Sequence, residues 1–202
     1  MPLLFYIILS SGIHNFAKLP IVNKDVIDIS TIDSTQQFKN NISIVTFIGN
    51  DINKKVKAEI FNLNEKIYKP FYEFKHFQFI VIVPNTNKTE IEHLKKQING
   101  YTNMKKWRFV FTNSDQIKTI YNSFKTNEPL DSNLHSSKAF IIDKHTNLRG
   151  RTDDKDSPNG LLLGYNMQSV AELNNKMKDD VKVILAEYRL ALKKNNADRE
   201  NN

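Results

Sequence analysis

The sequence predicts an α/β domain with a central mixed β-sheet and flanking helices. Runs rich in β-branched and aromatic residues alternate with stretches whose apolar residues recur every three or four positions. A hairpin signal follows the last of these runs, and a long apolar stripe near the C-terminus predicts a further helix. The chain has 202 residues, 40% of them hydrophobic, which is enough apolar material for one core.

Five segments are predicted as strands. Residues 42–48 and 77–83 are almost continuously apolar, which is typical of strands buried inside a sheet. Residues 107–111 and 138–143 are read in the same way, and residues 26–30 alternate apolar with polar side chains. A tight turn at residues 145–147 and a partner strand beginning at Leu148 complete a hairpin.

Amphipathic helices are predicted between the strands. The first has an apolar face at Val56, Ile60, Leu63 and Ile67, and Pro70 is expected to end it. The second covers residues 89–98. The third covers residues 114–124, with Ser114 as its N-cap. A β-α-β opening and a terminal hairpin together predict a thioredoxin-like sandwich.

The C-terminal segment predicts one long helix. Ser169 and Glu172 form a capping box, and with neither Gly nor Pro after Gly164 the helix is expected to continue to about Lys194. Its apolar stripe comprises Val170, Leu173, Met177, Val181, Ile184, Tyr188 and Leu192. Two interpretations stay open: a helix packed on its own domain, or one that binds a partner or a second copy. We expect the part up to Val181 to pack on the domain and the part from Ile184 to be more exposed.

The two ends of the chain are predicted to lie outside the domain. Residues 1–15 contain the apolar run from Pro2 to Leu9, too short for the roughly 20 residues that span a bilayer. It is interpreted as part of a membrane anchor, with a first core strand or helix as the alternative. The expected organisation is a domain over residues 16–164, a C-terminal helix over 165–194 and a disordered tail over 195–202.

Composition excludes several functions. The chain has no cysteine, so disulfides, thiolate catalysis and thiolate metal sites are excluded. The net charge is +7, but the lysines are scattered, which argues against nucleic-acid binding. Nucleotide-binding glycine motifs are absent from the sequence. No cofactor and no enzymatic activity are therefore predicted.

The order of elements resembles the thioredoxin superfamily and, within it, the Sco/SenC family of membrane-anchored copper chaperones. The stretches "KWRFVFTNSDQIKTI" and "LHSSKAFIIDKHTNLRG" look like that family's later strand, helix and histidine block. In the family a C-P-x-x-C-P turn and a late histidine bind copper. Here "GNDINKK" occupies the turn and His135 the histidine position. With its tail from "RGRTDD" onward, the chain looks still more like a cysteine-free bacterial branch of these proteins.

The turn from Gly49 to Lys55 and His135 are the candidate binding residues. A helix that follows a strand presents free N–H groups, so Asn50, Asp51, Lys54 and Lys55 are candidates for holding an anion or a partner's carboxylate. The alternative is an ordinary capped turn. His135 alone lacks the soft donors that Cu(I) needs, and no metal site is predicted.

The remaining polar residues are assigned to the surface. His14, His76, His93 and His145 are expected to be surface residues. The acidic run at Asp153, Asp154 and Asp156 does not follow the EF-hand spacing, so an ion-paired, solvated loop is expected there.

These observations favour a non-catalytic thioredoxin-fold binding or assembly module. The resemblance implies the inner membrane of a bacterium, with the domain facing the periplasm, and a link to the biogenesis of a respiratory complex. An unidentified protein partner is expected, together with membrane contact through the N-terminal segment. The alternative is a degenerate copper-handling protein that combines His135 with ligands from a partner.

Overall fold

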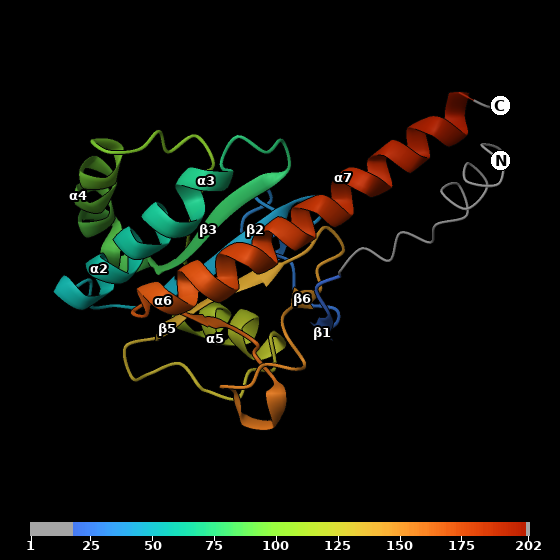
Figure 1. Cartoon of the computed structure of the whole chain (residues 1–202). Helices are drawn as coiled ribbons and strands as arrows, with labels where there is room; N and C mark the ends of the chain where they lie inside the picture. Colours follow the sequence, from blue (N-terminus) through green and yellow to red (C-terminus); the bar gives the residue numbers. More distant parts are fainter. Residues whose placement is uncertain (1–17, 201–202) are drawn as a thin grey trace, which may run out of the picture.

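A mixed β-sheet forms the centre of the computed structural model, which describes residues 18–200, with side chains described up to residue 191 (Figure 1). The strand order is β1-β6-β5-β2-β3-β4, and β7 pairs with β5. β2, β3 and β4 are parallel, whereas β5 runs antiparallel to β2. The strands are β1 (Ile21–Asn23), β2 (Ile42–Ile48), β3 (Phe77–Pro84), β4 (Trp107–Thr112), β5 (His135–Ile142), β6 (Leu148–Arg149) and β7 (Tyr165–Asn166).

Helices connect and cover the strands. The first helical stretch joins α2 (Lys54–Leu63), the π-helical turn η2 (Asn64–Tyr68) and α3 (Lys69–Phe71). α4 (Lys88–Asn99) and α5 (Ser114–Ser123) follow β3 and β4. The C-terminal stretch joins α6 (Val170–Glu172), the π-helical turn η5 (Leu173–Met177) and α7 (Lys178–Glu200). Single 3₁₀ turns are η1 (Ile29–Thr31), η3 (Asn85–Asn87) and η4 (Pro158–Gly160).

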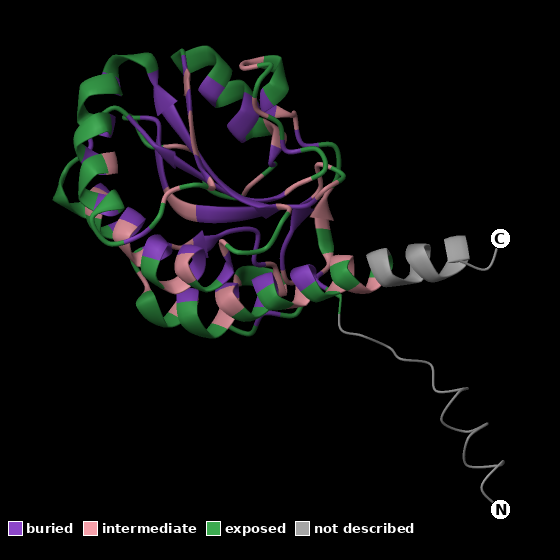
Figure 2. Ribbon diagram, turned by 90° about the horizontal axis from the view of Figure 1, so that it is seen from above, coloured by how far each residue is buried: buried purple, intermediate pink, exposed green. Residues whose placement is uncertain are grey.

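Two apolar cores lie on opposite faces of the sheet. On one face α2, α4 and α7 pack over the strands, and Ile60, Leu94 and Val181 belong to the same core cluster. On the other face α5 packs with the segment before β2, where Val26, Ile29 and Phe38 are buried. Every residue of β2 and β3 is buried between these layers (Figure 2). The prediction of an α/β sandwich with two fully buried central strands is confirmed.

Residues 26–30 do not form the predicted strand. The Asp28 side chain accepts hydrogen bonds from the backbone N–H groups of Ser30, Phe38 and Lys39, and it caps η1. These local bonds replace the bonds of a strand ladder. The strand of this region is instead β1, which pairs with β6.

Two predicted helix boundaries are also wrong. Asn113, not Ser114, caps α5, since its side chain accepts from the N–H of Gln116. Pro70 does not end the first helix, which continues to Phe71. In the preceding π turn the Lys69 N–H bonds to Asn64 O, and this wider turn accommodates the proline ring.

The C-terminal helix is part of the domain core. Leu173, Met177, Val181 and Ile184 are fully buried, so the predicted exposure from Ile184 onward is wrong at that residue. Val170, assigned to the apolar stripe, is 44% exposed because it lies in the first helical turn, before the helix reaches the sheet.

The limits of this C-terminal segment also differ from the expected ones. Residues 165–166 form β7 instead of helix, and α7 continues to Glu200, past the expected end near Lys194, since residues 195–200 contain neither Gly nor Pro. The expected N-terminal segment, residues 201–202 and the Leu192 side chain lie outside what the structure describes. None of the helices within residues 18–200 has the length and apolar character needed to cross a membrane.

Candidate functional site

The turn after β2 is held tightly against the chain that leads into β5. Gly49 has a φ of 68°, and a Cβ on this residue would lie 2.5 Å from the carbonyl oxygen of Asn133, so a side chain is excluded here. The N–H of Asn50 donates to that same oxygen over 2.7 Å. Asn87 Nδ2 donates to the carbonyls of Gly49 at 2.8 Å and Asn50 at 3.0 Å. These bonds fix the start of the α2 segment.

The predicted binding residues of this turn lie together on the surface. Asn50, Asp51, Lys54 and Lys55 are all exposed. Asn53 is the N-cap of α2, and its Oδ1 accepts from the N–H groups of Lys55 at 2.9 Å and Val56 at 3.2 Å. The helix amides that would bind an anion are therefore partly engaged by Asn53. What the turn offers to another molecule is its mixed array of side chains.

His135 is buried and bonded to a second buried residue, Glu59 of α2. The imidazole Nε2 lies 2.7 Å from Glu59 Oε2, and the two side chains are 9% and 1% exposed. The imidazole Nδ1 lies 3.6 Å from Asp131 Oδ2. Glu59 Oε1 is buried without a hydrogen-bond partner in the described structure. The pair therefore joins the start of β5 to the middle of α2.

Glu59 is a site residue that the sequence analysis missed. Val56, Glu59, Ile60 and Leu63 have the spacing i, i+3, i+4, i+7 and are all buried on one face of α2. An acidic residue inside an otherwise apolar stripe was the available signal, because buried carboxylates are rarely found without a partner.

A shallow pocket of about 380 Å³ lies beside His135. Lys55 lines it together with Asp131, His135, Ser136 and Ser137. The fold therefore brings Lys55 and His135, which are distant in sequence, to one concave surface. Asn50, Asp51 and Lys54 are not among the residues that line it.

The donor set around His135 does not fit copper. Cu(I) favours thiolate and thioether ligands, whereas the neighbours of His135 here are the carboxylates of Glu59 and Asp131. Within the described part of the chain, no group of three His, Asp or Glu side chains is arranged to hold a metal ion. Of the other histidines, His93 and His145 are exposed and His76 is half-buried, while His14 lies outside the described residues.

The acidic loop after β6 is ion-paired, as predicted, but Asp154 is buried instead of solvated. Lys176 Nζ lies 2.8 Å from Asp154 Oδ2 and 2.7 Å from Asp156 Oδ2. Burial alone would raise the pKa of Asp154, but the hydrogen bonds from Lys176 and Ser157 outweigh it and lower that pKa. The loop is thereby tied to η5.

A second ion pair connects the same loop to α7. Arg151 Nε lies 2.7 Å from Asp180 Oδ2, and this carboxylate also accepts from the Tyr165 hydroxyl at 2.6 Å. Burial and the neighbouring Asp180 charge raise the pKa of Tyr165 well above its ordinary value, so the hydroxyl stays protonated and donates. These contacts have a structural role in fixing α7 against β7.

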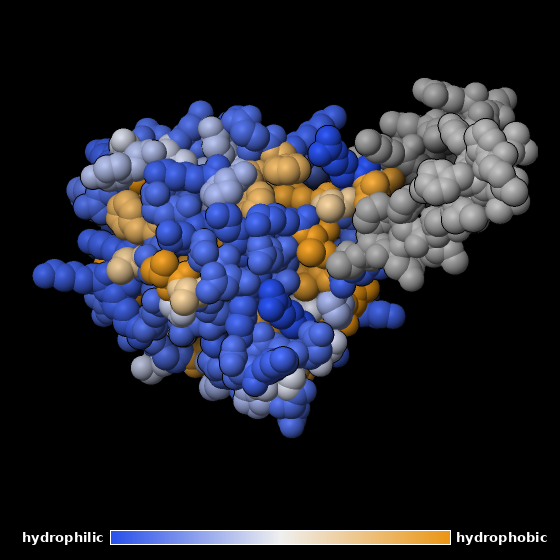
Figure 3. All heavy atoms as spheres, in the orientation of Figure 1, coloured by the Kyte–Doolittle hydropathy of each residue, from blue (hydrophilic) through white to orange (hydrophobic). Residues whose placement is uncertain are grey.

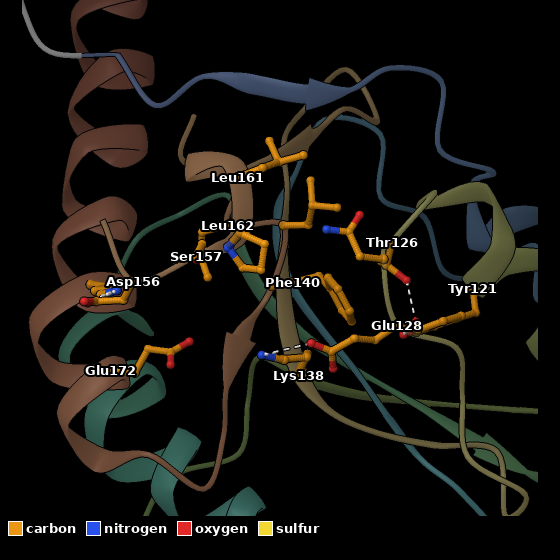
Figure 4. Close-up of a pocket in the computed structure, with 15 residues that line it drawn as sticks. Tyr121, Thr126, Glu128, Lys138, Phe140, Asp156, Ser157, Leu161, Leu162 and Glu172 are labelled. Atoms are coloured by element: carbon orange, nitrogen blue, oxygen red, sulfur yellow. Dashed lines mark hydrogen bonds and ion pairs between the residues drawn. The ribbon is translucent and has the colours of Figure 1, made fainter. Parts of the chain in front are cut away.

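The pocket of Figure 4, about 310 Å³, lies between β5, the loop before it and η4. Phe140 and Leu162 contribute its apolar wall. Its charged groups bond within the protein: Lys138 Nζ lies 3.6 Å from Glu128 Oε1, and Glu172 Oε1 accepts from the Asn166 N–H at 2.7 Å. Such a pocket has little charge left for a ligand.

Comparison with solved structures identifies the fold. A Sco1/SenC family lipoprotein from Bacillus anthracis is 12% identical and has a TM-score of 0.54, covering 83% of this chain and 98% of its own. BsSco, a member of the Sco family of cytochrome c oxidase assembly proteins for which a disulfide switch is described, is 13% identical. Its TM-score is 0.56, covering 84% of this chain and 98% of its own.

The chain has a thioredoxin-like, Sco/SenC-like fold. At these identities the likeness concerns the fold alone. No family model matches the sequence, and no curated protein sequence matches it either. Because this Sco/SenC-like chain has no cysteine, the thiol chemistry of a disulfide switch is not available to it.

Proposed function

We propose that this Sco/SenC-like chain is a non-catalytic binding or assembly module at the outer face of a bacterial inner membrane, linked to the biogenesis of a respiratory complex. The proposal rests on one observation: the Gly49–Lys55 turn and His135 lie together at one end of the parallel strands. The turn is bonded to the chain before β5, and its side chains Asn50, Asp51, Lys54 and Lys55 are exposed, while the chain contains no thiol.

The fold neighbours support the link to assembly. One is a lipoprotein and the other belongs to a family of cytochrome c oxidase assembly proteins. The apolar run from Pro2 to Leu9 supports membrane attachment. The proposed partner surface combines Asn50, Asp51, Lys54 and Lys55, so a partner with both basic and acidic side chains would fit it.

A photo-crosslinking experiment tests this proposal. A crosslinking amino acid at Asp51, in the membrane fraction of native cells, should couple to a subunit or assembly factor of a respiratory complex. The same residue at His93, which is exposed on α4, is the matched control. Equal crosslinking from both positions, or products unrelated to respiratory complexes, would refute the proposal. Loss of that complex's activity on deletion of the chain is a second expected result.

The alternative, copper handling through His135 and ligands from a partner, would have to use Nδ1, because Nε2 is bonded to Glu59 Oε2. The bond is short and both side chains are almost wholly buried. Nδ1 lies 3.6 Å from Asp131 Oδ2, so the groups beside the imidazole are carboxylate oxygens, which Cu(I) does not favour. This donor set is the reason we place the binding function on the exposed turn.

A further inference from the structure

A second surface lies at the opposite edge of the sheet. Ile42 begins β2, and Lys144 follows the end of β5, which runs antiparallel to β2, so both residues lie at the edge away from the Gly49–Lys55 turn. There α7 crosses the ends of the strands, and a pocket of about 410 Å³ opens between Leu185 and Tyr188 of α7 and the Phe74–His76 segment.

The centre of this surface is apolar. Phe74 is 39% exposed, which makes it one of the few large apolar side chains to reach the surface within the described residues. Beside it, Ile42 and Leu185 form the wall of the pocket, and Tyr188 is half-buried. Figure 3 shows apolar side chains exposed where α7 leaves the domain.

Basic residues surround this apolar centre, and we call them the basic rim. Lys75, Lys144 and Arg189 line the pocket directly. Lys106 adjoins them, because its Nζ donates to Lys75 O over 2.8 Å. The rim therefore comprises Lys75, Lys106, Lys144 and Arg189.

The rim carries an excess of positive charge. The one carboxylate among the described residues that line the pocket is Glu73, and it lies 3.4 Å from the ammonium group of Lys105. The nearby Glu187 is engaged by the guanidinium of Arg149. Burial, together with the charges of Lys144, Lys75 and Lys106, keeps the pKa of His76 below its ordinary value.

The described chain also enters the domain at this side. The carbonyl of Leu19 accepts from the Nε of Arg149 over 2.8 Å, and the same guanidinium contacts Glu187 of α7. Glu187 precedes Tyr188 of the pocket. The apolar run from Pro2 to Leu9 is therefore joined to the domain at a point near the basic rim.

We propose that the Phe74 surface with its basic rim docks on an anionic phospholipid membrane. The aromatic side chain enters the interface, and the rim contacts lipid phosphates. An apolar centre inside a basic border matches acyl chains below anionic headgroups. A nucleic-acid backbone would satisfy the rim but leave the apolar centre without a partner. The inference rests on the membrane location given under the proposed function.

The test is binding of the full chain to vesicles of phosphatidylcholine, with and without 30% phosphatidylglycerol. Residues 1–17 contain no Lys, Arg, Asp or Glu, so the loss on substituting rim lysines measures a dependence on anionic lipid that lies in the rest of the chain. Each basic residue at a membrane surface changes partitioning by about fivefold. The double variant Lys75→Gln/Lys144→Gln should therefore lose about 25-fold in partitioning onto the anionic vesicles.

The matched control is Lys88→Gln/Lys118→Gln, which removes the same charge from exposed residues of α4 and α5. It should lose about twofold or less, since these residues lie away from the rim. As a positional probe, the emission of the Phe74→Trp variant should shift to shorter wavelength on anionic vesicles. Trp107 is buried and adds a constant background.

Three results would each overturn the inference. They are equal losses for the two double variants, tight binding to pure phosphatidylcholine that no rim variant alters, and an unshifted Phe74→Trp spectrum. Unchanged thermal unfolding of all variants excludes a folding defect. If the rim variants abolish a protein crosslink but keep vesicle binding, the surface docks a protein and the membrane inference is wrong. The vesicle assay contains no partner protein, so its failure is distinguishable from failure of the proposed assembly function.

Discussion

The substitution His135→Ala tests whether the buried Glu59–His135 pair stabilises the fold. It removes the imidazole whose Nε2 lies 2.7 Å from Glu59 Oε2, while Glu59 Oε1 already lacks a partner in the described structure. In the variant, the Glu59 carboxylate, which is 1% exposed in the wild type, loses the hydrogen bond that the imidazole made. Leaving a buried carboxylate without its partner costs about 3–5 kcal/mol in the free energy of unfolding.

This loss should be visible in thermal and urea unfolding. For a chain of this size each kcal/mol lowers the Tm by about 2–4 °C, so His135→Ala should melt roughly 6–20 °C lower. The exposed His93 provides the control, since His93→Ala should change stability by less than about 0.5 kcal/mol. The comparison separates loss of the buried pair from loss of a histidine as such.

A double variant identifies the cause of the loss. Glu59→Met/His135→Leu replaces both members of the pair by apolar side chains, which is often neutral or stabilising at buried ion pairs. Its stability should therefore be higher than that of His135→Ala by several kcal/mol, about 2–4. A loss below about 1 kcal/mol in His135→Ala, or a double variant that is less stable than the single, would show that the pair does not stabilise the fold in this way.

Three further outcomes follow from the described contacts. Leu173→Asp should unfold the domain, because it buries an unpaired charge, whereas Ala191→Asp, on the exposed side of α7, should keep the wild-type Tm. The folded state lowers the pKa of Asp154, so the contribution of this carboxylate to stability is present above the unfolded pKa of about 3.9. That contribution is lost as pH falls through the lower folded pKa. Urea midpoints measured between pH 5 and pH 2 should therefore decline less steeply in Asp154→Asn than in the wild type. The purified protein should neither reduce insulin above a blank nor retain Cu(I) against a chelator, and copper that is retained stoichiometrically and lost in His135→Ala would favour the copper-handling alternative.

The sheet could be predicted because its signals are local. Residues 42–48 and 77–83 are apolar throughout, and in the structure both segments lie between two layers of helix. The prediction failed at residues 26–30, where the buried residues Val26 and Ile29 are three positions apart and the hydrogen bonding is not that of a strand. There Asp28 binds backbone amides ten and eleven residues later, a contact that no local pattern reveals.

The candidate site was predictable only in part. The turn and His135 follow from their places in the order of elements, but their relation depends on contacts across the fold. Glu59 and His135 are 76 residues apart in the sequence, and they meet because α2 packs beside the start of β5. Lys55 and His135 share a pocket for the same reason. Sequence spacing contains no information about such a pair until the sheet order is known.

The positions of the two surfaces suggest why a thiol-free chain would keep this fold. The Gly49–Lys55 turn lies where the parallel strands end, and the basic rim lies where they begin. A domain that rests on a membrane by its rim would direct the turn away from the bilayer, toward the partner of the proposed function. Neither task requires thiol chemistry, since one uses charge and apolar contact and the other uses a rigid hydrogen-bonded turn. The fully buried β2 and β3 between them supply the rigidity that keeps the two surfaces at a fixed separation.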